Sequence, residues 1–343
     1  MKKTIIFATV LAMLLLMMAG CGSTATPQAD NPPAPAENQS EQSSQAAPEQ
    51  APAADGKIKI GISFYQLSGE FNASERDAIY AYMDEMNLND SVEIMFMDAD
   101  YDAVKQNEQV DSLIQAGCQA IIMNAGDKDA QVSAVEAAAK ANIPMIELTS
   151  ATEATDLRTS YVGSEDIVSG RMLAEELCKR LEGGKGNLVI LHGPTGITPE
   201  IRRHEGLHEI LAGYPDIEIV AEKVCNWSRA EAMSAVENIL QSGMDVDIIF
   251  AENDEMAMGA LMAIQGSNYS KRIILGGIDA IPDAVQAVLD GGLDCTVFQD
   301  AVTQAKTALE VAIKAAKGES IDKLYDIPYK LVLQQNATEF LPK

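Results

Sequence analysis

Two short stretches of the sequence contain residues that could do chemistry. The first, HEGLH at residues 204–208, matches the H-E-x-x-H pattern, in which two histidines one helical turn apart bind zinc and the glutamate acts as a base. The second stretch places Glu252, Asn253, Asp254 and Glu255 side by side where the apolar run IIFA ends. Such a polar row could hydrolyse a bond, ligate a metal or bind a solute that leaves unchanged.

The zinc motif predicts a hydrolase that uses His204, Glu205 and His208. Three features of the sequence weaken this interpretation. The one further histidine, His192, lies upstream, no third ligand stands out downstream, and Gly206 is expected to interrupt the helix. A zinc hydrolase is therefore the less favoured alternative, and we assign no catalytic residue, no metal ligand and no cofactor.

Other catalytic patterns are weaker still. The pair Glu252 and Asp254 could serve a glycosidase, but most carboxylates are solvated in a chain with 51 acidic residues. The loop HGPTG lacks the phosphate-binding patterns, and its Pro194 removes an N–H donor. No G-x-S-x-G sequence marks a nucleophile. Binding without catalysis is the favoured class of function.

From Lys57 onward, short apolar runs alternate with segments of helical periodicity, one of which should end at Gly117. This alternation predicts an α/β fold, and so many strands over about 270 residues suit two doubly wound parallel sheets better than one. The predicted strands are IKIGISF, VEIMFMD, QAIIMN, PMIELT, TSYVG, GNLVILHG, IEIVAEKV, VDIIFAEN, RIILGGID and LDCTVFQD.

Most of these strands end in side chains that can donate or accept hydrogen bonds. In open parallel sheets, ligands bind outside the carboxyl ends of the strands, so two facing sheets would line one cleft from both sides. Trp227, the single tryptophan, and Phe71 could cover the C–H face of a sugar. The polar strand ends are Tyr65, Gln66, Asp98, Asn124, Thr149, Ser150, His192, Asn253, Asp279 and Gln299.

Composition and charge limit the partners. The chain has 343 residues, 47% of them hydrophobic, which suffices for one large or two ordinary domains. Its 25 basic and 51 acidic residues give a formal charge of −26, which repels nucleic acid and anionic membrane surfaces. We expect no nucleic-acid partner.

The N-terminus predicts export. Residues 1–21 consist of two lysines near the start, an apolar run and then small residues that end at Cys21. This order is typical of a bacterial lipoprotein signal peptide, in which the cysteine receives lipid. Residues 22–56, rich in Pro, Ala, Gln and Ser, are expected to be a disordered tether. The other four cysteines lie in or beside apolar segments and are expected to be buried, with pairing left open.

Four motifs, AENDEMAMGALMAIQ, GGIDAIPDAVQAVLDGG, IIMNAGDKDA and CTVFQD, resemble the periplasmic sugar-binding proteins of the ribose-binding type. The resemblance extends from about residue 57 to residue 343. It implies the type I periplasmic binding fold, with two α/β lobes joined by three crossovers. The N-terminal lobe would comprise 57–163 plus 300–328, and the C-terminal lobe 164–299 plus 329–343.

The resemblance also implies the ligand-binding residues. The family's sugar-contacting asparagines correspond to Asn253 and Asn124, its aspartate to Asp279, its glutamine to Gln299 and its stacking aromatic to Trp227.

The sequence departs from the family pattern at three places. Thr149 and Ser150 stand where an Asp-Arg pair is common, and Glu70 and Phe71 where twin phenylalanines are common. Ile201 stands at the usual arginine, and we place the ligand-binding arginine one step on, at Arg202. A hexose or an inositol-like polyol is therefore as plausible a ligand as ribose.

The resemblance implies a monomeric, lipid-anchored substrate-binding protein on the outer face of a bacterial cytoplasmic membrane. It would capture a sugar or polyol and deliver it to the permease of an ABC importer. One alternative is a receptor subunit for a chemoreceptor or sensor kinase. Another, a LacI-type regulator, requires a basic helix-turn-helix where this chain has its export signal.

Overall fold

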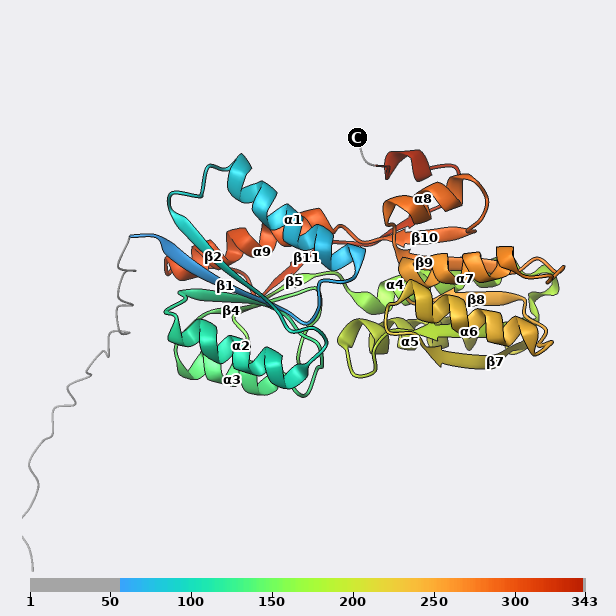
Figure 1. Ribbon diagram of the computed structural model, residues 1–343, viewed down its shortest axis with the longest axis horizontal. Coiled ribbons are helices and arrows are strands. Elements are labelled where there is room, and N and C mark those ends of the chain that lie inside the picture. The colour runs from blue at the N-terminus through green and yellow to red at the C-terminus, as the bar shows by residue number, and fades with distance from the viewer. Residues whose placement is uncertain (1–55, 342–343) are drawn as a thin grey trace, which may run out of the picture. The chain divides into compact units, whose positions relative to one another are not determined.

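The structure, a computed structural model, describes residues 56–341. The predictions for residues 1–21 and for nearly all of 22–56 lie outside the described residues. Within the described part, strands and helices alternate along the chain. The strands assemble into two separate sheets (Figure 1).

The first sheet has the strand order β11-β5-β4-β3-β1-β2, with all pairs parallel. Helices α1 and α9 pack on one face and α2 and α3 on the other, each pair over its own apolar core (Figure 1). The bounds are β1 (Ile58–Phe64), α1 (Glu70–Glu85), β2 (Val92–Asp98), α2 (Ala103–Gln115), β3 (Ala120–Asn124), α3 (Val132–Lys140), β4 (Met145–Leu148), β5 (Ser160–Gly163), α9 (Ala301–Ala316) and β11 (Leu324–Asp326).

The second sheet has the order β12-β10-β9-β8-β6-β7. Helices α4 and α5 cover one face, and α6, α7 and α8 cover the other. The bounds are α4 (Asp166–Lys179), η1 (Glu182–Gly184), β6 (Gly186–His192), α5 (Thr198–Leu211), β7 (Ile217–Val224), α6 (Arg229–Gln241), β8 (Ile248–Ala251), α7 (Asp254–Gly266), β9 (Ile274–Asp279), α8 (Pro282–Leu289), β10 (Cys295–Phe298), β12 (Lys330–Val332) and η2 (Ala337–Glu339).

The predicted α/β fold with two doubly wound sheets is confirmed. The chain passes between the sheets three times, after β5, after β10 and after β11. The apolar runs of the sequence mark neither of the two edge strands, although the resemblance implies a last strand within 329–343. Strands β11 and β12 have three residues each, too few for a periodic pattern, and β12 pairs with β10 antiparallel.

Local signals explain where several helices begin and end. The side chains of Asp102, Ser228 and Asn253 accept hydrogen bonds from the first backbone N–H groups of α2, α6 and α7. Gly117, just beyond α2, has φ 77°, as expected for the residue that ends a helix.

The expectation that Gly206 interrupts a helix is wrong, because α5 runs through it unbroken. A Cβ at Gly206 would lie 2.3 Å from the carbonyl oxygen of Ile167, and one at Gly170 would lie 2.2 Å from that of Arg203. These glycines allow the backbones of α4 and α5 to approach closely.

The four cysteines of the described part are free and buried, as expected. None of the helices within residues 56–341 is both long and apolar enough to cross a membrane.

Candidate functional site

A cavity with about 490 Å³ of empty space, partly open to solvent, lies between residues of both lobes. Its walls come largely from residues at the carboxyl ends of the parallel strands. In open parallel sheets, ligands bind in the crevice outside these strand ends. The lining residues are Tyr65, Gln66, Gly69, Glu70, Phe71, Asn72, Asn124, Thr149, Ser150, Ile197, Pro199, Arg203, Trp227, Asn253, Glu255, Asp279 and Gln299.

The structure brings all but one of the predicted ligand-binding residues to this cavity. The residues that line it are Glu70, Phe71, Asn124, Thr149, Trp227, Asn253, Asp279 and Gln299. Sequence reasoning missed Asn72, Pro199, Arg203 and Glu255, which also line it.

Arg202 does not line the cavity, and this placement corrects the prediction that named it. Its exposed side chain forms an ion pair with Glu205 on the surface of α5. The arginine of the cavity is Arg203. Helical spacing could have identified it, because Arg203 stands four residues from both Pro199 and Leu207, which share the buried face of α5.

Arg203 is the centre of the C-terminal wall. Its side chain is 4% exposed, and its Nη1 donates to the carbonyl oxygen of Glu252 at 2.6 Å. Its Nη2 donates to Gln299 Oε1 at 2.8 Å. The same nitrogen lies 3.6 Å from Asp166 Oδ1 and 3.7 Å from Asp279 Oδ1. The guanidinium therefore neutralises two buried carboxylates and fixes the glutamine amide.

The N-terminal wall is organised by Glu75, a fully buried residue of α1. Its carboxyl group lies within hydrogen-bond distance of the Thr149 hydroxyl and accepts from Asn124 Nδ2 at 3.3 Å. Thr149 takes the place of the family's usual acidic residue and has φ 63°, which is strained for a β-branched side chain. Buried polar contacts hold this strained position beside the cavity.

Four cavity-lining residues contain buried polar atoms that lack a hydrogen-bond partner. They are Asn124 Oδ1, Ser150 Oγ, Arg203 Nε and Gln299 Nε2, out of eight such atoms among the described residues. Because Gln299 Oε1 accepts a hydrogen bond from Arg203, the amide nitrogen Nε2 of Gln299 is the atom that can donate to a ligand. Because buried polar groups are normally paired, these atoms offer donors and acceptors to a ligand.

Acidic side chains outnumber basic ones in the lining of the cavity. Carboxylates of Glu70, Glu255 and Asp279 line it together with one guanidinium. Burial raises the pKa of Asp279 well above its usual value, although Arg203 opposes that shift. Burial, followed by the charges of Asp283 and Glu255, raises the pKa of Glu70. This balance disfavours an anionic ligand.

Trp227 forms the aromatic wall, with 8% of its surface exposed. The guanidinium carbon of Arg203 lies 5.6 Å from the centre of its ring. A Cβ at Gly193 would lie only 2.1 Å from Cζ2 of the indole, so only glycine leaves room for this ring position.

Replacing Gly193 with alanine is therefore expected to displace the indole and to weaken solute binding by at least about tenfold. The shift should appear in the tryptophan emission spectrum of the ligand-free protein. Gly266→Ala is the matched control, because no atom lies within 4 Å of its Cβ position. Unchanged emission in Gly193→Ala would contradict this packing.

The two stretches with possible catalytic chemistry do not form catalytic sites. Glu205, the expected base of the zinc motif, pairs with Arg202 on the surface of α5. Asp254 is fully buried and accepts hydrogen bonds from the Thr296 hydroxyl at 2.7 Å and from Ile281 N at 3.1 Å. It therefore stabilises the start of α7 and does not face the cavity.

Comparisons with known proteins agree with this geometry. Residues 60–320 match the family described as periplasmic binding protein domain. A xylitol-binding protein from Mycolicibacterium smegmatis is 34% identical, over 79% of this chain and 76% of its own. The ribose import binding protein of Bacillus subtilis is 31% identical, over 81% of this chain and 88% of its own length. An ABC transporter solute binding protein from Bacillus halodurans, solved with bound myo-inositol, is 37% identical and superposes with a TM-score of 0.79. The match covers 84% of this chain and 98% of that one.

Proposed function

Because this chain belongs to the periplasmic binding protein family, whose members bind solutes and are not enzymes, we propose that it captures a small polyhydroxylated solute in the cavity between its lobes. The solute is a monosaccharide or a cyclic polyol, delivered to the permease of an ABC importer. The four unpartnered polar atoms in the cavity wall carry this proposal.

Each of those atoms can form a hydrogen bond with a hydroxyl group, either as the donor or as the acceptor. Arg203 Nε and Gln299 Nε2 can donate to hydroxyl oxygens, and Asn124 Oδ1 can accept from a hydroxyl hydrogen. Trp227 and Phe71 supply aromatic surface for the C–H groups of the ring. Since Arg203, the basic residue of the lining, is already paired with Asp166 and Asp279, we expect the solute to be neutral or cationic.

Contacts between the lobes indicate how capture works. Lys128 N donates to the carbonyl oxygen of Gly196 at 2.9 Å, and the Thr198 hydroxyl donates to that of Ala151. Each pair joins the two sheets at the rim of the cavity. A solute that contacts both walls would favour this closed arrangement, which the permease would then recognise.

The lobe boundaries of the sequence analysis belong to the same proposal, with 57–163 plus 300–328 in one lobe and 164–299 plus 329–343 in the other. So do the signal peptide, the tether of residues 22–56, lipidation at Cys21 and a monomeric state. These features would hold the domain at the outer face of the cytoplasmic membrane. Palmitate labelling that is lost in Cys21→Ala would test the anchor.

A solute panel tests the capture function. The panel contains pentoses, hexoses, pentitols, cyclitols, an amino-cyclitol and a uronic acid, and binding is followed by tryptophan fluorescence and thermal shift. We expect a response to one neutral or cationic class and none to the uronic acid. The proposal fails if no member changes either signal.

Asn253→Ala should weaken binding of the solute so identified by about tenfold, the value of one hydrogen bond near 1.4 kcal/mol. Asn253 Oδ1 also accepts from Met256 N at 3.0 Å, so losing this cap should lower the free energy of unfolding by about 1 kcal/mol. Asp102→Ala removes a comparable cap outside the cavity lining. Equal affinities in the two variants would contradict the ligand contact of Asn253.

A further inference from the structure

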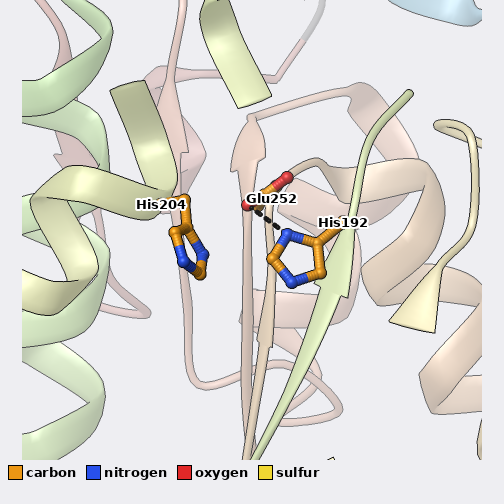
Figure 2. Close-up of side chains that lie close together, drawn as sticks. All are labelled: His192, His204 and Glu252. Carbon is orange, nitrogen blue, oxygen red and sulfur yellow. Dashed lines mark hydrogen bonds and ion pairs between the residues drawn. The ribbon is translucent and has the colours of Figure 1, made fainter. Parts of the chain in front are cut away.

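All three histidines of the chain gather in one place, although they come from different elements. His192 ends β6, while His204 and His208 lie one turn apart on α5. The ring centres of His192 and His204 are 4.9 Å apart, and those of His204 and His208 are 4.4 Å apart. Figure 2 shows the first two rings beside the carboxylate of Glu252.

Three carboxylates surround the imidazole of His192. Its Nδ1 lies 3.1 Å from Glu252 Oε1 and 3.4 Å from Glu200 Oε1, and its Nε2 lies 3.0 Å from Glu222 Oε2. Acidic groups therefore face both ring nitrogens of His192 and fix the orientation of its ring.

His204 is the histidine of this cluster whose ring nitrogens are available to bind a metal. Its side chain makes no hydrogen bond to any described residue, and its Nδ1 is buried. A neutral imidazole with free lone pairs is the form that ligates metals.

We propose that His192, His204 and Glu252 bind one divalent transition-metal ion, with zinc as the reference metal. Their ligand atoms all lie within 4.8 Å of one another. Zinc bonds of about 2.0–2.1 Å place tetrahedral neighbours about 3.4 Å apart, so side-chain rotation must shorten these separations by up to about 1.4 Å. Both imidazoles bind a metal in their neutral form, so any proton that they carry is released to solvent on binding.

This site differs from the H-E-x-x-H arrangement, because it uses only His204 of that motif. Two imidazoles and a carboxylate favour zinc, copper or nickel over calcium or magnesium. A water molecule or the nearby Glu222 would complete the coordination.

The position suggests a structural role beside the cavity. Two of the ligands adjoin a residue of the cavity wall, because His204 follows Arg203 and Glu252 precedes Asn253. The third, His192, precedes Gly193, which packs on the wall residue Trp227. A bound metal would join the ends of β6 and β8 to α5 and stabilise this wall. This role is independent of the proposed solute, and a test with metal alone separates the two.

The test is zinc binding by protein that has been stripped with a chelator and dialysed, followed by calorimetry and elemental analysis. Wild-type protein should bind about one equivalent of Zn²⁺ and should unfold at a higher temperature when zinc is present. His204→Ala should bind zinc at least about tenfold more weakly. His208→Ala, which removes a histidine of the same helix outside the proposed ligands, should retain wild-type affinity.

His192→Gln keeps a polar partner for Glu252 and provides a second ligand variant, which should lose affinity as His204→Ala does. The melting temperature of each variant without zinc shows whether it folds. The proposal is overturned if wild-type protein binds zinc more weakly than about 1 mM, or if His204→Ala and His208→Ala lose affinity equally.

Discussion

Replacing Arg203 with methionine is expected to lower the free energy of unfolding by about 3–5 kcal/mol, because the change leaves buried carboxylates without their cation. The side chains of Asp166 and Asp279 are 3% and 6% exposed, and Arg203 Nη2 is the cation within 4 Å of both. Methionine fills a similar length but supplies no charge and no hydrogen-bond donor. Urea unfolding monitored by circular dichroism measures the loss.

The same substitution should weaken solute binding by at least about 30-fold, since it also removes the donor Nε and frees the amide of Gln299. Arg202→Met is the matched control one residue away. Its exposed pair with Glu205 should contribute less than about 1 kcal/mol, and it should leave affinity unchanged. Similar losses in both variants would contradict the assignment of Arg203 to the cavity.

The strands and the ends of strands could be predicted because burial on both faces of a parallel sheet leaves uninterrupted apolar runs in the sequence. Several of these runs end in a polar residue that lines the cavity, as Asn124 and Asp279 do, whereas the ends of β2 and β6, Asp98 and His192, do not. These signals are local. They identified most of the cavity from residues that are far apart in the chain.

The helical contribution to the cavity was harder to predict. Which face of α5 is buried depends on its packing against α4, where Gly170 and Gly206 allow backbone contact. The rotation of α5 about its own axis, which this packing fixes, determines whether Arg202 or Arg203 lies at the cavity. The sequence alone offered two adjacent arginines, and resemblance to a family pattern favoured the wrong one.

Buried polar networks depend on side-chain directions that no sequence pattern specifies. Glu75 and Gln304 meet at the Thr149 hydroxyl although 229 positions separate them. The cluster of His192, His204 and Glu252 likewise joins two strand ends and a helix. Of the H-E-x-x-H motif, only His204 belongs to this cluster.

The Glu75 network also predicts how stability changes with pH. The Thr149 hydroxyl lies within hydrogen-bond distance of Glu75 and 2.8 Å from Gln304 Oε1. One hydroxyl hydrogen cannot serve two acceptors, so we infer that a protonated Glu75 donates to Thr149, which donates to Gln304. Burial agrees with this arrangement, because it raises the pKa of Glu75 to about 8.

In the unfolded chain the pKa of a glutamate is near 4.3. Between that value and about 8 the folded protein holds a proton that the unfolded chain has released, so stability falls as pH rises through this window. The contribution of Glu75 should amount to about 3–4 kcal/mol lost between pH 5 and pH 8. Above pH 8 both states are ionised, and the contribution becomes constant.

Glu75→Gln should abolish this dependence, because the amide nitrogen can still donate to Thr149 and carries no titratable proton. Urea unfolding should give similar stabilities for the variant and the wild type at pH 5, and a variant more stable by about 3–4 kcal/mol at pH 8. Glu85→Gln changes an exposed glutamate of the same helix that pairs with Lys306, so it should not alter the slope. A difference between Glu75→Gln and wild type that stays constant from pH 5 to pH 8 would mean that Glu75 is already ionised in the folded protein, and that the Thr149 hydroxyl donates to it rather than to Gln304.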